Sequence, residues 1–200
     1  MNLSIIIPVN GKIRHDISFF SNVFKYEVLV FEPDTFTPSL GDFCDRNGYY
    51  HICSDSINDN RYFDNVLKIA SGEILAFIDG DMKVSKNWVD EVCFTHYNNS
   101  WCQYLCGPIR IKTKKDLKEA ASEKWPKSLV KEIQLVYNGE IKSVEPIQYF
   151  TNSNMSVKKS RFEKKILQIG HIGILPQLSP GLFVLENNIF SERVQAFYES

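Results

Sequence analysis

The chain has 200 residues, of which 44% are hydrophobic and 24% charged, and its formal net charge is -1. This length suffices for one globular domain with a substantial core, and the balanced charge excludes a global attraction to nucleic acid or anionic membranes. No apolar run is long enough to cross a bilayer, and residues 1–12 lack the features of a secretory signal. We therefore expect a cytoplasmic protein that binds no nucleic acid and is either free or peripherally associated with the inner face of a membrane.

Cysteine and histidine spacing predicts no zinc site. The cysteines are odd in number and form no CxxC pair, and no suitably spaced histidines complete a zinc site. They are Cys44, Cys53, Cys93, Cys102 and Cys106. Buried free thiols are the expectation for four of them, and reduced thiols agree with a cytoplasmic location. His51 and His96 have no partner at a meaningful spacing, so we expect structural roles for both.

Residues 1–100 alternate between strand-like and helix-like segments. Four short apolar runs predict strands, at residues 3–9, 27–31, 49–53 and 73–78. Residues 59–71 carry apolar side chains at helical spacing, with Asp59 placed to cap the helix and Gly72 placed to end it in a left-handed conformation. The alternation predicts an α/β fold with right-handed parallel crossovers, in which ligands bind at the carboxyl ends of the strands.

Residues 101–200 follow a less regular α+β pattern. The predicted elements are a strand over 101–112, a charged helical stretch over 113–136, strands near 143–150 and 182–185, a loop over 170–181, and a helix from about Glu186. We interpret residues 1–200 as a single domain, with a ligand-binding half at 1–100 and a second half at 101–200.

The clearest chemical motif is Asp79-Gly80-Asp81, which directly follows the fourth predicted strand. Side chains at i and i+2 of an extended chain point the same way, and the intervening glycine permits a tight turn. Two carboxylates on one side are hard oxygen ligands suited to Mg²⁺ or Mn²⁺. Diphosphate oxygens and water would complete the coordination shell of the metal. An ordinary acidic turn that caps the next helix is the alternative interpretation of the same residues.

Several ordered segments resemble the family-2 glycosyltransferases, which have the GT-A fold. They are LSIIIPV at 3–9, YEVLVFEPDT at 26–35, NVLKIASGEILAFIDGDM at 65–82, TNSNMSVKKSRF at 151–162 and LENNIFSER at 185–193. The resemblance covers nearly the whole chain. It implies a Rossmann-like mixed sheet flanked by helices, in one compact domain with a nucleotide-sugar-binding half and an acceptor-binding half.

The family resemblance also implies a reaction and its residues. A UDP- or GDP-sugar would donate its sugar, with inversion, to a hydroxyl of a glycan or lipid-linked saccharide. The loop of Pro8, Val9 and Asn10, together with Glu32, would face the nucleotide base. The metal, Mn²⁺ or Mg²⁺, would be held by Asp79, which also lies near the ribose, and by Asp81 as its main ligand. Glu186 would be the catalytic base that takes the proton of the attacking hydroxyl.

Some positions depart from the family pattern. The second predicted strand ends in Glu32-Pro33-Asp34, so either acid could contact the nucleotide base. Phe63 stands where the family has an arginine, and Arg61 is the candidate replacement for binding the donor. Asn187 stands where a second acid is expected, which leaves open a degenerate protein that binds nucleotide or glycan, or acts as a scaffold. A nucleotidyltransferase is a third interpretation, but the segment after the first strand has a single glycine, Gly11, instead of a glycine-rich signature.

Overall fold

The computed structural model describes residues 2–9, 13–14, 16–33, 36–54, 60–102, 104–107, 109–111, 154–160, 188–190, 194 and 196–198. Its helices are α1 (Pro38–Asn47), α2 (Asn60–Ile69) and α3 (Trp88–Asn98). Its strands are β1 (Asn2–Pro8), β2 (Lys25–Pro33), β3 (Tyr50–Ser54), β4 (Ile74–Ile78), β5 (Met82–Val84), β6 (Tyr104–Cys106), β7 (Ile109–Ile111), β8 (Asn154–Lys158), β9 (Asn188–Phe190) and β10 (Ala196–Tyr198). The four strands predicted in the first hundred residues and the helix at 59–71 are all present.

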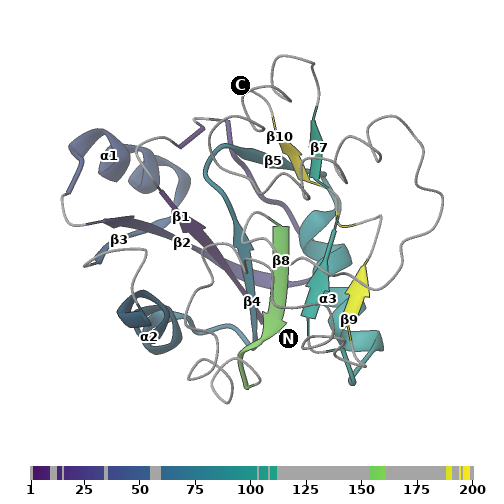
Figure 1. Ribbon diagram of the computed structural model, residues 1–200. Coiled ribbons are helices and arrows are strands. Elements are labelled where there is room, and N and C mark those ends of the chain that lie inside the picture. Colours follow the sequence, from purple (N-terminus) through teal and green to yellow (C-terminus); the bar gives the residue numbers. More distant parts are fainter. Residues whose placement is uncertain are drawn as a thin grey trace.

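A mixed sheet of seven strands, in the order β3-β2-β1-β4-β8-β6-β9, runs through the molecule (Figure 1). The first four positions are parallel, and β8 runs antiparallel to both β4 and β6. The chain adds β2 and β3 on one side of β1 and then returns to add β4 on the other side. In parallel α/β sheets such a reversal creates a crevice at the carboxyl ends of the two central strands, here β1 and β4.

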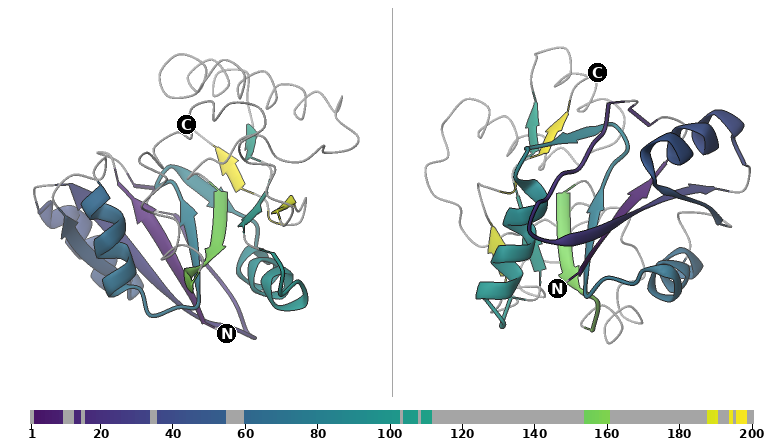
Figure 2. Two further views of the ribbon diagram at one scale, coloured as in Figure 1. Left: turned by 60° about the horizontal axis from the view of Figure 1, so that its bottom comes forward. Right: turned by 180° about the vertical axis from the view of Figure 1, so that it is seen from behind.

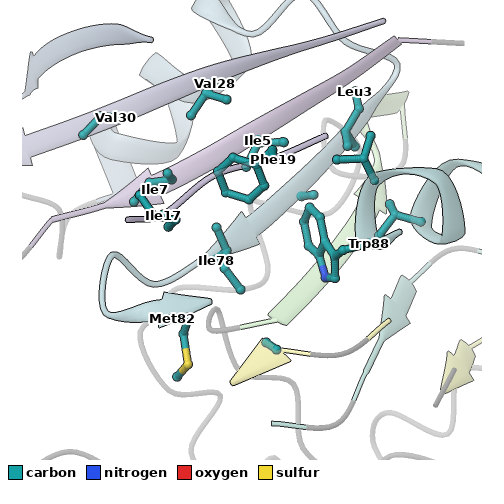
Figure 3. Close-up of a cluster of buried hydrophobic side chains, with 14 of the residues drawn as sticks. Leu3, Ile5, Ile7, Ile17, Phe19, Val28, Val30, Ile78, Met82 and Trp88 are labelled. Atoms are coloured by element: carbon teal, nitrogen blue, oxygen red, sulfur yellow. The ribbon is translucent and has the colours of Figure 1, made fainter. Parts of the chain in front are cut away.

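Helices cover both faces of the parallel strands, which explains their continuous apolar sequences. On one face, Leu3, Ile5 and Ile7 of β1 lie beside Val28 and Val30 of β2, in one buried cluster with side chains of α1 and α3 (Figure 3). On the other face, Phe31 packs edge-on against Tyr62 of α2, with ring centroids 5.1 Å apart. Figure 2 shows α2 and α3 on opposite sides of the sheet. The first hundred residues therefore form three layers.

Two glycines at helix ends act differently from the sequence prediction. Gly48 ends α1 in a left-handed conformation, with φ of 67°. It is the only described glycine with positive φ, so the left-handed ending predicted for Gly72 is wrong. Gly72 lies instead against β1, where a Cβ atom would come within 2.5 Å of the Ser4 backbone nitrogen. Close approach of two backbones, and not chain reversal, requires glycine at this position.

The second half of the chain completes the sheet with short strands. The single strand predicted over 101–112 is instead two strands, β6 and β7, which belong to different sheets. The helix predicted from about Glu186 is wrong over its described part, because residues 188–190 form β9 and residues 196–198 form β10. Backbone pairing of β9 with β6 overrides the local helical pattern. The elements predicted at 113–136, 143–150, 170–181 and 182–185 lie outside the described residues.

A second sheet of three strands, in the order β5-β10-β7, lies past the carboxyl end of β4 (Figure 1). Strand β10 pairs antiparallel with β5, where Tyr198 is opposite Met82, and parallel with β7. Within the described ranges, no helix is both long and apolar enough to span a membrane.

Candidate active site at the carboxyl edge of the sheet

The turn formed by Asp79, Gly80 and Asp81 connects β4 to β5 at the edge of the sheet. The backbone nitrogen of Met82 donates to the Asp79 carbonyl oxygen at 3.1 Å, which closes the turn. The backbone nitrogen of Arg14 donates to the Gly80 carbonyl oxygen at 2.8 Å and ties the turn to the segment that follows β1. Gly80 is buried, whereas both aspartates are partly exposed. The turn is therefore fixed through its backbone, and one carboxylate oxygen of Asp81, Oδ1, is buried.

An ion-pair cluster lies beside this turn. Asp16 accepts a hydrogen bond from Arg14 Nε at 2.9 Å and lies 2.6 Å from Lys83 Nζ. These bonds, first from Arg14 and then from Lys83, hold the pKa of the Asp16 carboxyl well below its usual range. Arg14 belongs to the segment that follows β1 and Lys83 belongs to β5, directly after the turn, so the cluster links these two segments beside the turn. It also places positive charge near the aspartates, which suits an anionic ligand.

Tyr62 of α2 is a neighbour of the turn that sequence reasoning missed. The side chain is 2% exposed. Burial raises the pKa of the Tyr62 hydroxyl well above its usual value, and the charge of Asp79 adds to this effect. Tyr62 therefore stays neutral near Asp79, within the core that supports the turn. Its spacing placed it on the apolar face of the helix predicted over residues 59–71, but nothing in the sequence connected it with Asp79.

The segment at the end of β1 is held to β2 and to the core. Val9 is only 4% exposed, and its backbone nitrogen donates to the Phe31 carbonyl oxygen at 2.8 Å. Its side chain therefore belongs to the core, and Pro8 is partly buried at the strand end. Asn10, the third residue predicted for this loop, lies outside the described residues.

Glu32, at the end of β2, has both carboxylate oxygens engaged. One oxygen accepts from the Thr37 backbone nitrogen at 2.9 Å and lies 2.9 Å from His51 Nε2; the other accepts from the Thr37 hydroxyl. Burial alone would raise the pKa of Glu32, but the bonds from Thr37 and His51 outweigh it and lower the pKa. Glu32 thus anchors the start of α1. His51, predicted to have no partner, pairs with it because β2 and β3 are adjacent in space.

The remaining predicted site residues are described only in part. Arg61 belongs to the first turn of α2, as its backbone shows. Glu186, the predicted catalytic base, lies outside the described residues, immediately upstream of β9. The structure therefore brings together the ends of β1 and β4 with the aspartate turn, while the roles of Arg61 and Glu186 stay predictions.

A buried polar joint fixes the second half of the chain next to the aspartate turn. Asn154, the first residue of β8, pairs with Ile78, the last residue of β4. Its side chain accepts from Trp88 Nε1 at 2.9 Å and donates to the Val194 carbonyl oxygen at 2.8 Å. Gly107 lies so close that a Cβ atom would come within 1.6 Å of that carbonyl oxygen. The segment around Asn154 is part of the family resemblance, but its sequence does not indicate these contacts.

Comparison with known proteins supports the fold and no finer assignment. No protein-family model matches the chain, and no curated protein matches it. Among solved structures, the chain is similar to residues 1–349 of TarS from S. aureus, with a TM-score of 0.53 and 15% sequence identity. The match covers 82% of this chain and 49% of the TarS chain, so this chain spans about half the length of that structure. The fold is therefore glycosyltransferase-like.

Proposed function

We propose that this protein is a metal-dependent, inverting glycosyltransferase that transfers a sugar from a UDP- or GDP-sugar to a glycan or lipid-linked acceptor. The main support is the position of Asp79 and Asp81. In a glycosyltransferase-like fold, they lie at the carboxyl edge of β4, where the strand order reverses. The likeness to TarS supports the fold alone and indicates neither donor nor acceptor.

The residues of the aspartate turn fit a hard divalent cation. Their donor set is two carboxylates, partly exposed and held by a fixed backbone. Such a half-site suits Mg²⁺ or Mn²⁺, which retain water and bind phosphate oxygens alongside few protein ligands. When bound, the metal would neutralise charge on the departing diphosphate. The chain's own residues would position the donor, and Arg14 and Lys83 would add positive charge beside the turn.

In the proposed reaction, Glu186 takes the proton of the acceptor hydroxyl as the oxygen attacks the anomeric carbon. Inversion requires attack from the side opposite the leaving nucleotide, so this base belongs to the acceptor half of the chain. The Asn154 joint attaches that half directly to the end of β4. The backbone at Val9, with Glu32 and Arg61, is proposed to bind the nucleotide.

Thermal unfolding with nucleotides provides a direct test. The midpoint would be measured with UDP, GDP, CDP and their sugars, each with and without Mn²⁺. A ligand at a hundredfold above its Kd stabilises the folded state by about 2.7 kcal/mol, which gives a readable shift. We expect a metal-dependent shift with UDP or GDP that Asp81→Asn abolishes. Asp42→Asn, an exposed aspartate of α1, is the matched control and should keep the shift.

The outcomes separate the proposals. No metal-dependent shift with any nucleotide, or an unchanged shift in Asp81→Asn, would contradict the proposed site. A shift without transfer to any acceptor would instead favour a degenerate member that binds nucleotide, the alternative that Asn187 raises. Pyrophosphate release from a nucleoside triphosphate would indicate a nucleotidyltransferase.

A further inference from the structure

Three donor side chains of different chemistry share one face of the sheet at the ends of β2 and β3. In the parallel register of these strands, Glu32 lies opposite Cys53. His51 and Cys53 are two residues apart on β3, so their side chains point to the same side. Hence a carboxylate, an imidazole and a thiol project together toward α1. The sequence contained this signal only as His-x-Cys on a predicted strand.

The donor atoms of these residues lie within reach of a single ion. One ligand atom from each residue lies within 4.8 Å of the other two, and His51 Nε2 is 2.9 Å from a Glu32 oxygen. Ligands about 2.0 to 2.3 Å from a tetrahedral zinc are roughly 3.3 to 3.6 Å apart. A small opening of the Glu32–His51 pair and a rotation of the exposed Cys53 side chain would bring the three to that spacing.

The surroundings already orient two of the three donors. Thr37 binds both oxygens of Glu32 through its backbone nitrogen and hydroxyl. The Phe36 ring packs against the His51 ring with centroids 4.9 Å apart. Gly41 of α1 permits this packing, since a Cβ there would come within 2.8 Å of the Phe36 ring. Hydrogen-bonded carboxylates are typical of metal sites, where outer contacts orient the ligands, and here the Phe36 ring restricts the orientation of the His51 ring.

We propose that Glu32, His51 and Cys53 bind one Zn²⁺-like divalent ion, separate from the aspartate turn, with water completing the coordination. The donor set selects the metal class: imidazole and thiolate favour Zn²⁺ or Co²⁺ over Mg²⁺. The thiol and the imidazole must each give up the proton at the binding atom, so the ion displaces protons and affinity falls at low pH. The ion would pin β2, β3 and the start of α1 together.

Cobalt titration of the reduced protein tests this assignment, because a cobalt–thiolate bond gives an intense near-ultraviolet charge-transfer absorption. We expect this absorption to saturate at one Co²⁺ per chain and to disappear on addition of Zn²⁺. Cys53→Ser should abolish this absorption. His51→Ala removes a ligand, so it should weaken Co²⁺ binding at least as much as Thr37→Val, which removes only a contact to a ligand. The Thr37 variant keeps all three ligands and should lose 10- to 100-fold in affinity, as outer contacts do. Cys102→Ala, which removes a buried thiol, is the control and should retain the absorption.

Two results would overturn the assignment: no charge-transfer absorption in the wild type, or the same absorption in Cys53→Ser. Because Cys53 is exposed, its serine variant should fold, and its thermal midpoint without metal verifies this. Glu32 also belongs to the proposed nucleotide site, so two variants at unshared residues distinguish failure of this proposal from failure of the proposed function. Asp81→Asn should keep the cobalt absorption, and Cys53→Ser should keep Mn²⁺-dependent nucleotide binding.

Discussion

Replacing Asn154 with alanine should destabilise the protein strongly, because its side chain satisfies two buried groups at once. The substitution leaves Trp88 Nε1 and the Val194 carbonyl oxygen without their 2.9 and 2.8 Å bonds. Asn154 is 2% exposed, so water cannot readily replace its side chain. An unsatisfied buried polar group costs about 1 to 3 kcal/mol, which gives about 2 to 6 kcal/mol for the pair. For a chain of this length, each kcal/mol of destabilisation lowers the thermal midpoint by roughly 2 to 4 °C, so a loss of about 4 kcal/mol lowers it by about 8 to 16 °C.

Urea unfolding of the wild type and Asn154→Ala measures this difference directly. Asn99→Ala is the matched control, because the Asn99 side chain makes one bond, 2.9 Å to the Thr95 carbonyl oxygen, at a partly exposed site. The control should cost about 1 kcal/mol or less. A double-mutant cycle with Trp88→Phe should give a coupling energy of about 0.5 to 3 kcal/mol. A loss below about 1 kcal/mol in Asn154→Ala, or no coupling, would refute the reasoning.

Three further predictions concern stability and reactivity. Gly72→Ala should lower the free energy of unfolding, measured in urea, by about 1 to 3 kcal/mol, because the added Cβ would meet the backbone of β1. A decrease near zero would show that β1 can shift to accommodate the Cβ without cost. Burial above all lowers the pKa of His96 from 6.5 to about 4, so as pH falls the unfolded chain takes up the proton first. The contribution of neutral His96 to the free energy of unfolding should be fully present above pH 6.5 and should fall by roughly 3 kcal/mol toward pH 4. In His96→Gln, the free energy of unfolding should decline less over this pH range than in the wild type. Among the described cysteines, a thiol reagent at pH 8 should modify the exposed Cys53 first, because burial raises the pKa of two other thiols and shields them from the reagent. Mass spectrometry measures the modification rate of each cysteine, and equal rates would contradict the burial pattern. The two raised values are about 11 for Cys44 and about 12 for Cys93.

The parallel half of the fold was predictable because its strands are buried on both faces. Such strands must be apolar throughout, as Ile74–Ile78 is, so their sequence alone reveals them. The aspartate turn was predictable for the same reason, since it directly follows such a strand. Helix α1 was not identified individually, although Pro38 at its start and Gly48 after its end are recognisable signals in retrospect.

The second half was less predictable because its strands have three to five residues and owe their conformation to partners far away in sequence. Strand β9 pairs with β6, where Ile189 is opposite Leu105, and a local helical pattern cannot anticipate that contact. The Glu32–His51 pair was missed for a related reason. Its residues lie on different strands, and only the register of β2 and β3 brings them together.

The pairing of β5 with β10 has a consequence for how the protein matures during synthesis. Met82 and Tyr198 are partners although they are more than a hundred residues apart in the chain. Contacts of such long range carry a large loop-closure cost and form late in folding. A nascent chain can assemble β1 to β4 early. Strand β5, which follows the aspartate turn, can pair with β10 only when residues 196–198 have left the ribosome. A ribosome-bound intermediate should therefore possess the paired strands β1 to β4 before the second sheet beside the aspartate turn has formed.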